Sequence, residues 1–158
     1  RALSQARMEM KLGQTWRRLW VLLLLLKRRK CFATMTKAER GQAGERNAEL
    51  HLRTKGFRVL NRNWRKGRDE IDLVCLHEGT LVFVEVRTRE ESALISGYHS
   101  VGYKKKRALL RVCKAYLTSH RRQSAHYRFD LVEVRWKKKV KATCLHYENV
   151  ALFTDHSH

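Results

Sequence analysis

The chain has 158 residues, no proline, and a formal net charge of +20 from 35 Lys and Arg against 15 Asp and Glu. This length fits one domain that can bury a real core, and a hydrophobic share of 43% argues against a disordered chain. The excess charge points to a polyanionic partner, with nucleic acid (ribosomal RNA included) first and an anionic membrane surface second.

The four cysteines are far apart in the sequence and form no CxxC pair, which argues against a disulfide framework and against a zinc motif. Cys75, Cys113 and Cys144 lie in apolar patterns that are typical of small core residues. We therefore expect a reduced, cytoplasmic protein without disulfides.

Residues 1–34 differ from the rest, with nine Lys and Arg against the single acid Glu9. The apolar run 19–26 is shorter than the roughly 20 residues of a membrane span. Basic residues 27–30 follow it, where a signal peptide would carry a small-residue cleavage site. We expect 1–34 to be an N-terminal extension outside the fold and 35–158 to be a single domain, with a membrane-surface anchor as the alternative role for the extension.

The first predicted helix starts at Thr36-Lys37-Ala38-Glu39, which has the capping-box pattern, and stops near Gly56. Glu45, Ala48 and Leu52 fall on one stripe of this helix. Glu45 would then face inward, where an acid needs a function. A partly exposed Glu at the edge of the stripe explains the pattern equally well.

A strand over 57–64 comes next and leads into a hairpin predicted over 69–87. Glu78-Gly79 suits a two-residue turn because glycine stands at its second position. The strand and the hairpin are joined by a basic loop that contains Arg65, Lys66 and Arg68.

The hairpin turn sets the register of the two strands. It places Asp72 opposite Glu85 and Glu70 opposite Arg87. Like charges at opposing positions destabilise a strand pair, so a divalent cation between Asp72 and Glu85 would turn that cost into a site. A solvated hairpin end with a plain Glu–Arg pair is the alternative.

The second hairpin strand is apolar on both faces, with Leu81 and Phe83 on one side and Val82 and Val84 on the other. This pattern predicts a strand that is buried on both faces. A buried Glu85 would need a cation or good hydrogen bonds, which makes it a candidate ligand.

A polar loop is predicted over 88–102 and a helix over 104–117. Four cations in the first turn of this helix oppose its macrodipole, so a bound anion would explain them; a solvated basic turn is the alternative. Strands over 127–136 and 140–147 complete the pattern. The order of helix, three strands, helix and two strands predicts an α/β sandwich with a mixed sheet.

With these segments placed, the chain resembles the YraN family, small bacterial proteins assigned to the PD-(D/E)XK nuclease superfamily. The match covers about residues 37–152. The resemblance implies a restriction-endonuclease-like three-layer sandwich, in which helices flank a mixed central β-sheet. The motifs that carry it are Gly44-Glu45 with Ala48, Glu70-Ile71-Asp72-Leu73, Phe83-Val84-Glu85-Val86-Arg87, Val101 with the lysines at 104 to 106, Arg128-Phe129-Asp130 and Asn149-Val150-Ala151.

The resemblance also implies roles. Glu45 matches the helix acid, Asp72 the first metal-binding acid, and Glu85 the acid of the E-x-K signature. Arg87 stands where the family usually has Lys, and Asp69 where it usually has Gly before Glu-Ile-Asp. Arginine stays protonated and cannot take a proton from water, although it can hold a phosphate oxygen. The change therefore bears on catalysis more than on binding, and Lys105 is a candidate for the missing ammonium.

We therefore predict an endonuclease-like protein that hydrolyses phosphodiester bonds of nucleic acid, with DNA, branched DNA included, as the first candidate substrate. Asp72, Glu85 and the Val86 carbonyl would hold Mg²⁺ or Mn²⁺. Glu45 would complete the acidic cluster and Arg87 would brace the phosphate. The predicted backbone contacts are Arg65, Lys66, Arg68, Lys104, Lys105, Lys106 and Arg107.

The main alternative is a non-catalytic nucleic-acid-binding module on a degenerate nuclease fold, which the Arg at position 87 favours. No GxxxxGK, GxGxxG, HExxH or GxSxG motif is present, so we expect no small-molecule cofactor. A homodimer would suit two cuts on a duplex.

Overall fold

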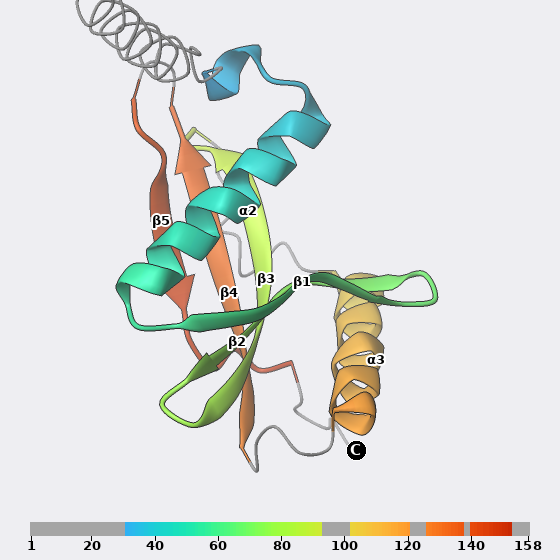
Figure 1. The fold of residues 1–158 in the computed structure, drawn as a ribbon. Coiled ribbons are helices and arrows are strands. Elements are labelled where there is room, and N and C mark those ends of the chain that lie inside the picture. The colour runs from blue at the N-terminus through green and yellow to red at the C-terminus, as the bar shows by residue number, and fades with distance from the viewer. Residues whose placement is uncertain (1–30, 93–101, 121–125, 138–139, 153–158) are drawn as a thin grey trace, which may run out of the picture. The chain divides into compact units, whose positions relative to one another are not determined.

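The computed structural model describes residues 31–92, 102–120, 126–137 and 140–152 (Figure 1). Most of the predicted extension over 1–34 lies outside these ranges. Of its described end, η1 (Phe32–Thr34) is a 3₁₀ turn, and the Phe32 ring stacks on Trp136 with 6.1 Å between ring centroids. Neither of the two long helices in the described ranges is long and apolar enough to cross a membrane.

Helix α2 (Lys37–Thr54) begins with the predicted capping box. The Glu39 N–H donates to Thr36 Oγ1 at 3.2 Å, and the Thr36 N–H donates to Glu39 Oε2 at 2.8 Å, so both backbone donors are satisfied. The chain leaves the helix through Gly56, whose φ of +86° is the left-handed conformation that glycine adopts without strain.

A five-stranded sheet follows, in the order β1-β2-β3-β4-β5. Strands β3 and β4 are parallel and the other neighbours are antiparallel, so the sheet is mixed as predicted. The crossover between β3 and β4 contains helix α3 (Tyr103–Ser119). The strands are β1 (Arg58–Lys66), β2 (Asp69–His77), β3 (Thr80–Glu90), β4 (Tyr127–Trp136) and β5 (Thr143–Tyr147).

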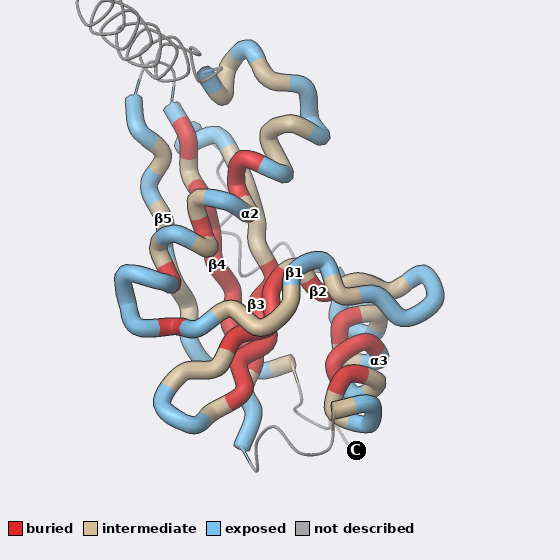
Figure 2. Tube along the Cα trace, viewed as in Figure 1, coloured by how far each residue is buried: buried red, intermediate tan, exposed pale blue. Residues whose placement is uncertain are grey.

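Two separate cores confirm the three-layer α/β sandwich, with one helix on each face of the sheet (Figure 1). Phe83 packs on the α3 side and Val84 on the α2 side, so β3 is buried on both faces as its sequence predicts. Figure 2 shows the buried residues along the strands and on the inner sides of the helices. Cys75 and Cys113 are core residues, also as predicted.

The β2–β3 hairpin has the predicted turn. Glu78–Gly79 both have positive φ, as in the two-residue turns that match the twist of a hairpin. His77 pairs with Thr80, and the ladder continues in the predicted register up to Leu73 and Val84.

Beyond that point the two strands separate, and Asp72 and Glu85 form no ladder pair. The predicted pair of Glu70 with Arg87 is wrong. Glu70 pairs with Arg65 of β1 instead, with 2.8 Å between Arg65 Nη2 and Glu70 Oε2, while β3 continues alongside β4. Each strand follows its other neighbour, which leaves room between their outer halves.

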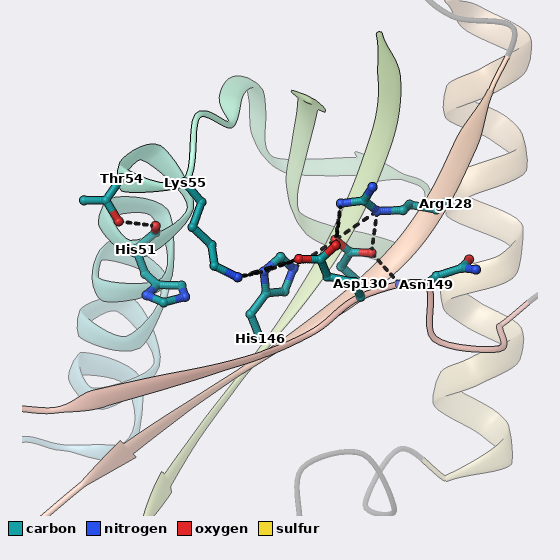
Figure 3. A network of polar contacts seen from close by, with 8 residues as sticks. His51, Thr54, Lys55, Arg128, Asp130, His146 and Asn149 are labelled. Atoms are coloured by element: carbon teal, nitrogen blue, oxygen red, sulfur yellow. Dashed lines mark hydrogen bonds and ion pairs between the residues drawn. The ribbon is translucent and has the colours of Figure 1, made fainter. Parts of the chain in front are cut away.

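A buried polar cluster ties β4 to β5 and to the segment after β5 (Figure 3). Asp130 is fully buried and accepts hydrogen bonds from Arg128 Nε at 3.0 Å and from the Asn149 N–H at 2.9 Å; His146 Nε2 also lies 2.9 Å away. Burial opposes ionisation of Asp130, but these contacts together hold its pKa below the usual range. The Arg128–Asp130 and Asn149 motifs therefore stabilise the fold and lie apart from the acids considered below.

Candidate active site

One cleft of about 580 Å³ lies where β2 separates from β3. Its lining comes from the first half of α2, from Asp72 of β2, from the outer half of β3 and from Trp136 of β4. The cleft thus brings together residues that are far apart in the sequence. The charged residues in its lining are Lys37, Arg40, Glu45, Asp72, Glu85, Arg87, Arg89 and Glu90.

Asp72 occupies the point at which the β2–β3 ladder ends. Its Oδ2 accepts the Val86 N–H at 2.7 Å, so a side chain replaces the next ladder bond. Burial and the nearby Glu85 carboxylate raise the pKa of Asp72 to about 7. The predicted proximity of Asp72 and Glu85 is therefore present, although the two residues are not a cross-strand pair.

Glu85 is buried, with 3% of its surface exposed. Its Oε1 lies 3.0 Å from Lys105 Nζ and 3.4 Å from Arg87 Nη2. Its Oε2 is buried and has no hydrogen-bond partner in the described part of the chain. Burial raises the pKa of Glu85, while Lys105 and Arg87 act in the opposite direction. One oxygen of this carboxylate is held by cations and the other has no partner among the described residues.

Glu45 reaches the same cleft from α2, as its inward position predicts. Its Oε2 accepts a hydrogen bond from Asn63 Nδ2 at 3.1 Å. Asn63 lies in β1 with a φ of 46°, a left-handed conformation that asparagine tolerates better than most residues. Sequence reasoning missed Asn63; the available signal was an asparagine, a poor strand former, in the middle of a strand.

The residues predicted to contact a nucleic-acid backbone are exposed, apart from the half-buried Lys105. The cations of the β1–β2 turn lie close to α3, because Arg111 Nε contacts Asp69 Oδ2 at 2.7 Å (Figure 1). The other predicted cations lie in the first turn of α3, where Lys105 contacts Glu85. The proposed ammonium is therefore next to the acidic cluster.

Lys37, Arg40 and Arg89 also line the cleft, and sequence reasoning missed all three. The signal for the first two was their spacing of three residues on the helix that carries Glu45. Arg40 Nε and Arg87 Nε are buried, and neither has a hydrogen-bond partner in the described ranges. The cleft thus leaves both an acceptor and donors unsatisfied.

This combination fits a metal ion together with a bound phosphate. The carboxylates of Asp72 and Glu85 are the oxygen ligands that Mg²⁺ and Mn²⁺ prefer. No group of three or more His, Cys, Asp and Glu side chains among the described residues could hold a metal by itself. A metal at Asp72 and Glu85 would therefore need backbone, water or phosphate oxygens to complete its coordination.

Comparison with known proteins identifies the family of this chain. Residues 44–134, more than half of it, match the model of "Uncharacterised protein family UPF0102". The chain belongs to the UPF0102 family. This family is the YraN family, so the resemblance seen in the sequence is confirmed. The matched segment contains Glu45, Asp72 and Glu85.

Two UPF0102 relatives illustrate the match. The UPF0102 protein of Lawsonia intracellularis is 41% identical over 119 residues, which are 75% of this chain and 89% of the relative. The UPF0102 protein of Alkaliphilus oremlandii is 39% identical over 112 residues, which are 69% of this chain and 94% of the relative. The names of both relatives give the family and state no activity.

The raised pKa of Asp72 predicts that the protein loses stability as the pH rises from about 4 to about 7. Over this window an unfolded aspartate is ionised while the folded one keeps its proton, so unfolding becomes easier with rising pH. Asp72→Asn removes this penalty and can still accept the Val86 N–H. We expect it to raise the free energy of unfolding by on the order of 2 kcal/mol near pH 8 and by much less near pH 4.

Urea unfolding in EDTA at both pH values measures this difference. Asp69→Asn is the matched control, because Arg111 lowers the pKa of Asp69. Removal of the Asp69 charge should therefore lower the free energy of unfolding near pH 8. Destabilisation by Asp72→Asn at both pH values would contradict the prediction.

Proposed function

We propose that the protein is a metal-dependent nuclease that hydrolyses phosphodiester bonds of nucleic acid, with DNA as the first candidate. The observation that carries this proposal is the set of buried atoms left without partners in one cleft. Glu85 Oε2 needs a cation or a donor, whereas Arg40 Nε and Arg87 Nε need acceptors. A divalent metal would satisfy Glu85 Oε2, and the phosphates of a bound nucleic-acid strand would satisfy the two guanidinium groups.

Asp72, Glu85 and the Val86 carbonyl would hold Mg²⁺ or Mn²⁺. The metal would supply a polarised phosphate and a bound water that is easier to deprotonate. Two observations support this assignment: the buried Glu85 Oε2 without a partner in the described ranges, and the raised pKa values of two adjacent buried carboxylates, which a cation would reverse.

The other residues of the cleft then have separate tasks. Glu45, held by Asn63, would orient the attacking water. The Arg87 guanidinium would bind a phosphate oxygen and stabilise the charge that develops on it. Lys105, 3.0 Å from Glu85, can exchange a proton, which Arg87 cannot do. Lys105 thus supplies the group that the family usually places at position 87.

The rival function is nucleic-acid binding without cleavage, which the arginine at position 87 favours. It predicts that EDTA and Asp72→Asn leave binding unchanged. Both functions share the exposed cations of the β1–β2 turn and of the α3 first turn. Affinity should therefore fall steeply with salt in either case.

Mn²⁺ titration by calorimetry tests the metal site without a choice of substrate. We expect the wild-type chain to bind Mn²⁺ and Asp72→Asn to bind it at least about tenfold more weakly. Asp69→Asn, on the same strand but paired with Arg111, should bind as the wild type does.

A cleavage assay completes the test. Supercoiled plasmid should be nicked with Mn²⁺, and not in EDTA or by Asp72→Asn. Metal-dependent nicking that Asp72→Asn retains would overturn the assignment. Plasmid binding that is insensitive to EDTA, without nicking, would favour the rival.

A further inference from the structure

The end of the cleft away from Asp72 and Glu85 has its own arrangement of charge. Lys37 and Arg40 face it from the first turn of α2, and Trp136 closes it from β4. The Arg40 guanidinium carbon lies 5.3 Å from the centroid of the Trp136 ring. Phe32 stacks on the same ring, so the indole is held in place by the core and serves as a fixed surface for Arg40.

This packing orients Arg40 without satisfying it. The stacked ring offers no acceptor, and Arg40 Nε is buried with no hydrogen-bond partner among the described residues. Neither Arg40 nor Lys37 forms an ion pair within those ranges, although Glu90 lines the same cleft. A buried charged donor without an acceptor is costly, and a planar guanidinium matches a phosphate.

The floor of the cleft between this end and the acids is open. Gly41 lies between Arg40 and Glu45, and a Cβ added at Gly41 would meet nothing within 4 Å. At a rise of 1.5 Å per residue, Lys37 lies roughly 12 Å along α2 from Glu45. This separation exceeds the size of one phosphate group, which favours a separate phosphate for the Lys37 end of the cleft.

We propose that Lys37 and Arg40 form a second phosphate subsite, which binds the backbone of the same nucleic-acid strand about two nucleotides from the bond held at Asp72 and Glu85. The inference rests on the proposed function and adds a substrate class to it. The cleft takes an extended strand with several phosphates, and a single phosphodiester occupies only the acidic end.

Fluorescence anisotropy tests the subsite in EDTA with the full chain, using a labelled strand of about 16 nucleotides as a single strand and as a duplex. Arg40→Ala should weaken binding of whichever probe the wild type binds more tightly, by about fivefold to tenfold. It should also lower the slope of log affinity against log salt concentration by about one charge. Arg46→Ala, on the same helix but outside the cleft lining, should change binding less than about twofold. Gly41→Leu should weaken binding by obstruction, with no change in the salt dependence.

Competition separates the sources of the phosphate. A dinucleotide, with one phosphodiester, should displace the probe equally well from wild type and Arg40→Ala, whereas an octanucleotide should lose affinity for Arg40→Ala. Inorganic phosphate should be a weak competitor in both. Equal octanucleotide affinities of wild type and Arg40→Ala would overturn the subsite. A variant that loses affinity for inorganic phosphate but not for the octanucleotide would also overturn it.

Mn²⁺ titration of Arg40→Ala keeps the two proposals apart. Normal Mn²⁺ binding with unchanged octanucleotide affinity would overturn the subsite alone. A wild type that binds the strand through Arg40 but takes up no Mn²⁺ would support the subsite and overturn the metal site.

Discussion

Lys105→Ala is expected to lower metal-dependent phosphodiester cleavage by about a thousandfold, the range of a lost proton-transfer group. Lys105 Nζ lies 3.0 Å from Glu85 Oε1, beside the carboxylates assigned to the metal. Lys105→Arg keeps the charge but cannot exchange a proton, so it should restore binding of the strand and leave the rate low. Initial rates with saturating Mn²⁺, together with anisotropy of the same variants, measure the two effects.

A second substitution makes this prediction sharper. Arg87→Lys gives the chain the residue that the YraN family usually carries, and we expect it to recover part of the rate in the Lys105→Ala background. Lys114→Ala, at an exposed lysine of the same helix outside the predicted backbone contacts, is the control and should change the rate by less than about threefold. A fast Lys105→Arg variant would show that Lys105 acts through its charge alone.

Gly44→Ala is expected to lower the free energy of unfolding by about 2 to 3 kcal/mol, the usual effect of overpacking. An added Cβ would overlap Thr88 Oγ1 and would lie 3.0 Å from Thr88 Cβ and 3.2 Å from its Cγ2. Rotation of Thr88 does not remove the contact, because Thr88 Cβ itself lies 3.0 Å from the added atom and stays in place when χ1 turns. Helix α2 would have to move away from β3, and Glu45 would move with it.

Urea unfolding of two further variants isolates this contact. Thr88→Ala should recover at least half of the loss in the Gly44→Ala background, since it removes two of the three crowded atoms. Gly41→Ala, on the same helix but with open space around it, should stabilise the protein by about 0.5 to 1 kcal/mol. Equal effects at the two glycines would show that helix propensity, and not the approach of α2 to β3, decides the result.

The two glycines also explain how the site is assembled. Gly44 lets α2 approach β3 closely at Thr88, three residues beyond Glu85 on the strand. Glu45, next along the helix, is thereby placed at the cleft that Asp72 and Glu85 also line. In the Gly-Glu pair of α2, the glycine thus allows close packing on β3 and the glutamate supplies a carboxylate to the cleft.

Several features of this protein followed from the sequence alone. The capping box set the start of α2, the Glu78–Gly79 turn set the register of β2 against β3, and apolar positions on both faces marked β3 as a buried strand. Each depends on contacts within a few residues or across one tight turn, where backbone geometry leaves few choices. The helix stripe, the hairpin register and the family resemblance together predicted Glu45, Asp72 and Glu85 as one site, and all three line the cleft.

Only the tertiary structure decided which side chains contact these acids. β2 separates from β3 at Asp72 because β2 continues to pair with β1 while β3 continues to pair with β4. The hairpin sequence by itself does not contain these neighbouring strands. The contact of Asn63 with Glu45, of Lys105 with Glu85, and of Arg40 with Trp136 each joins residues from different elements. Such contacts depend on how whole helices pack on the sheet, because a side chain's partner across a cleft is chosen by three-dimensional distance and not by spacing along the chain.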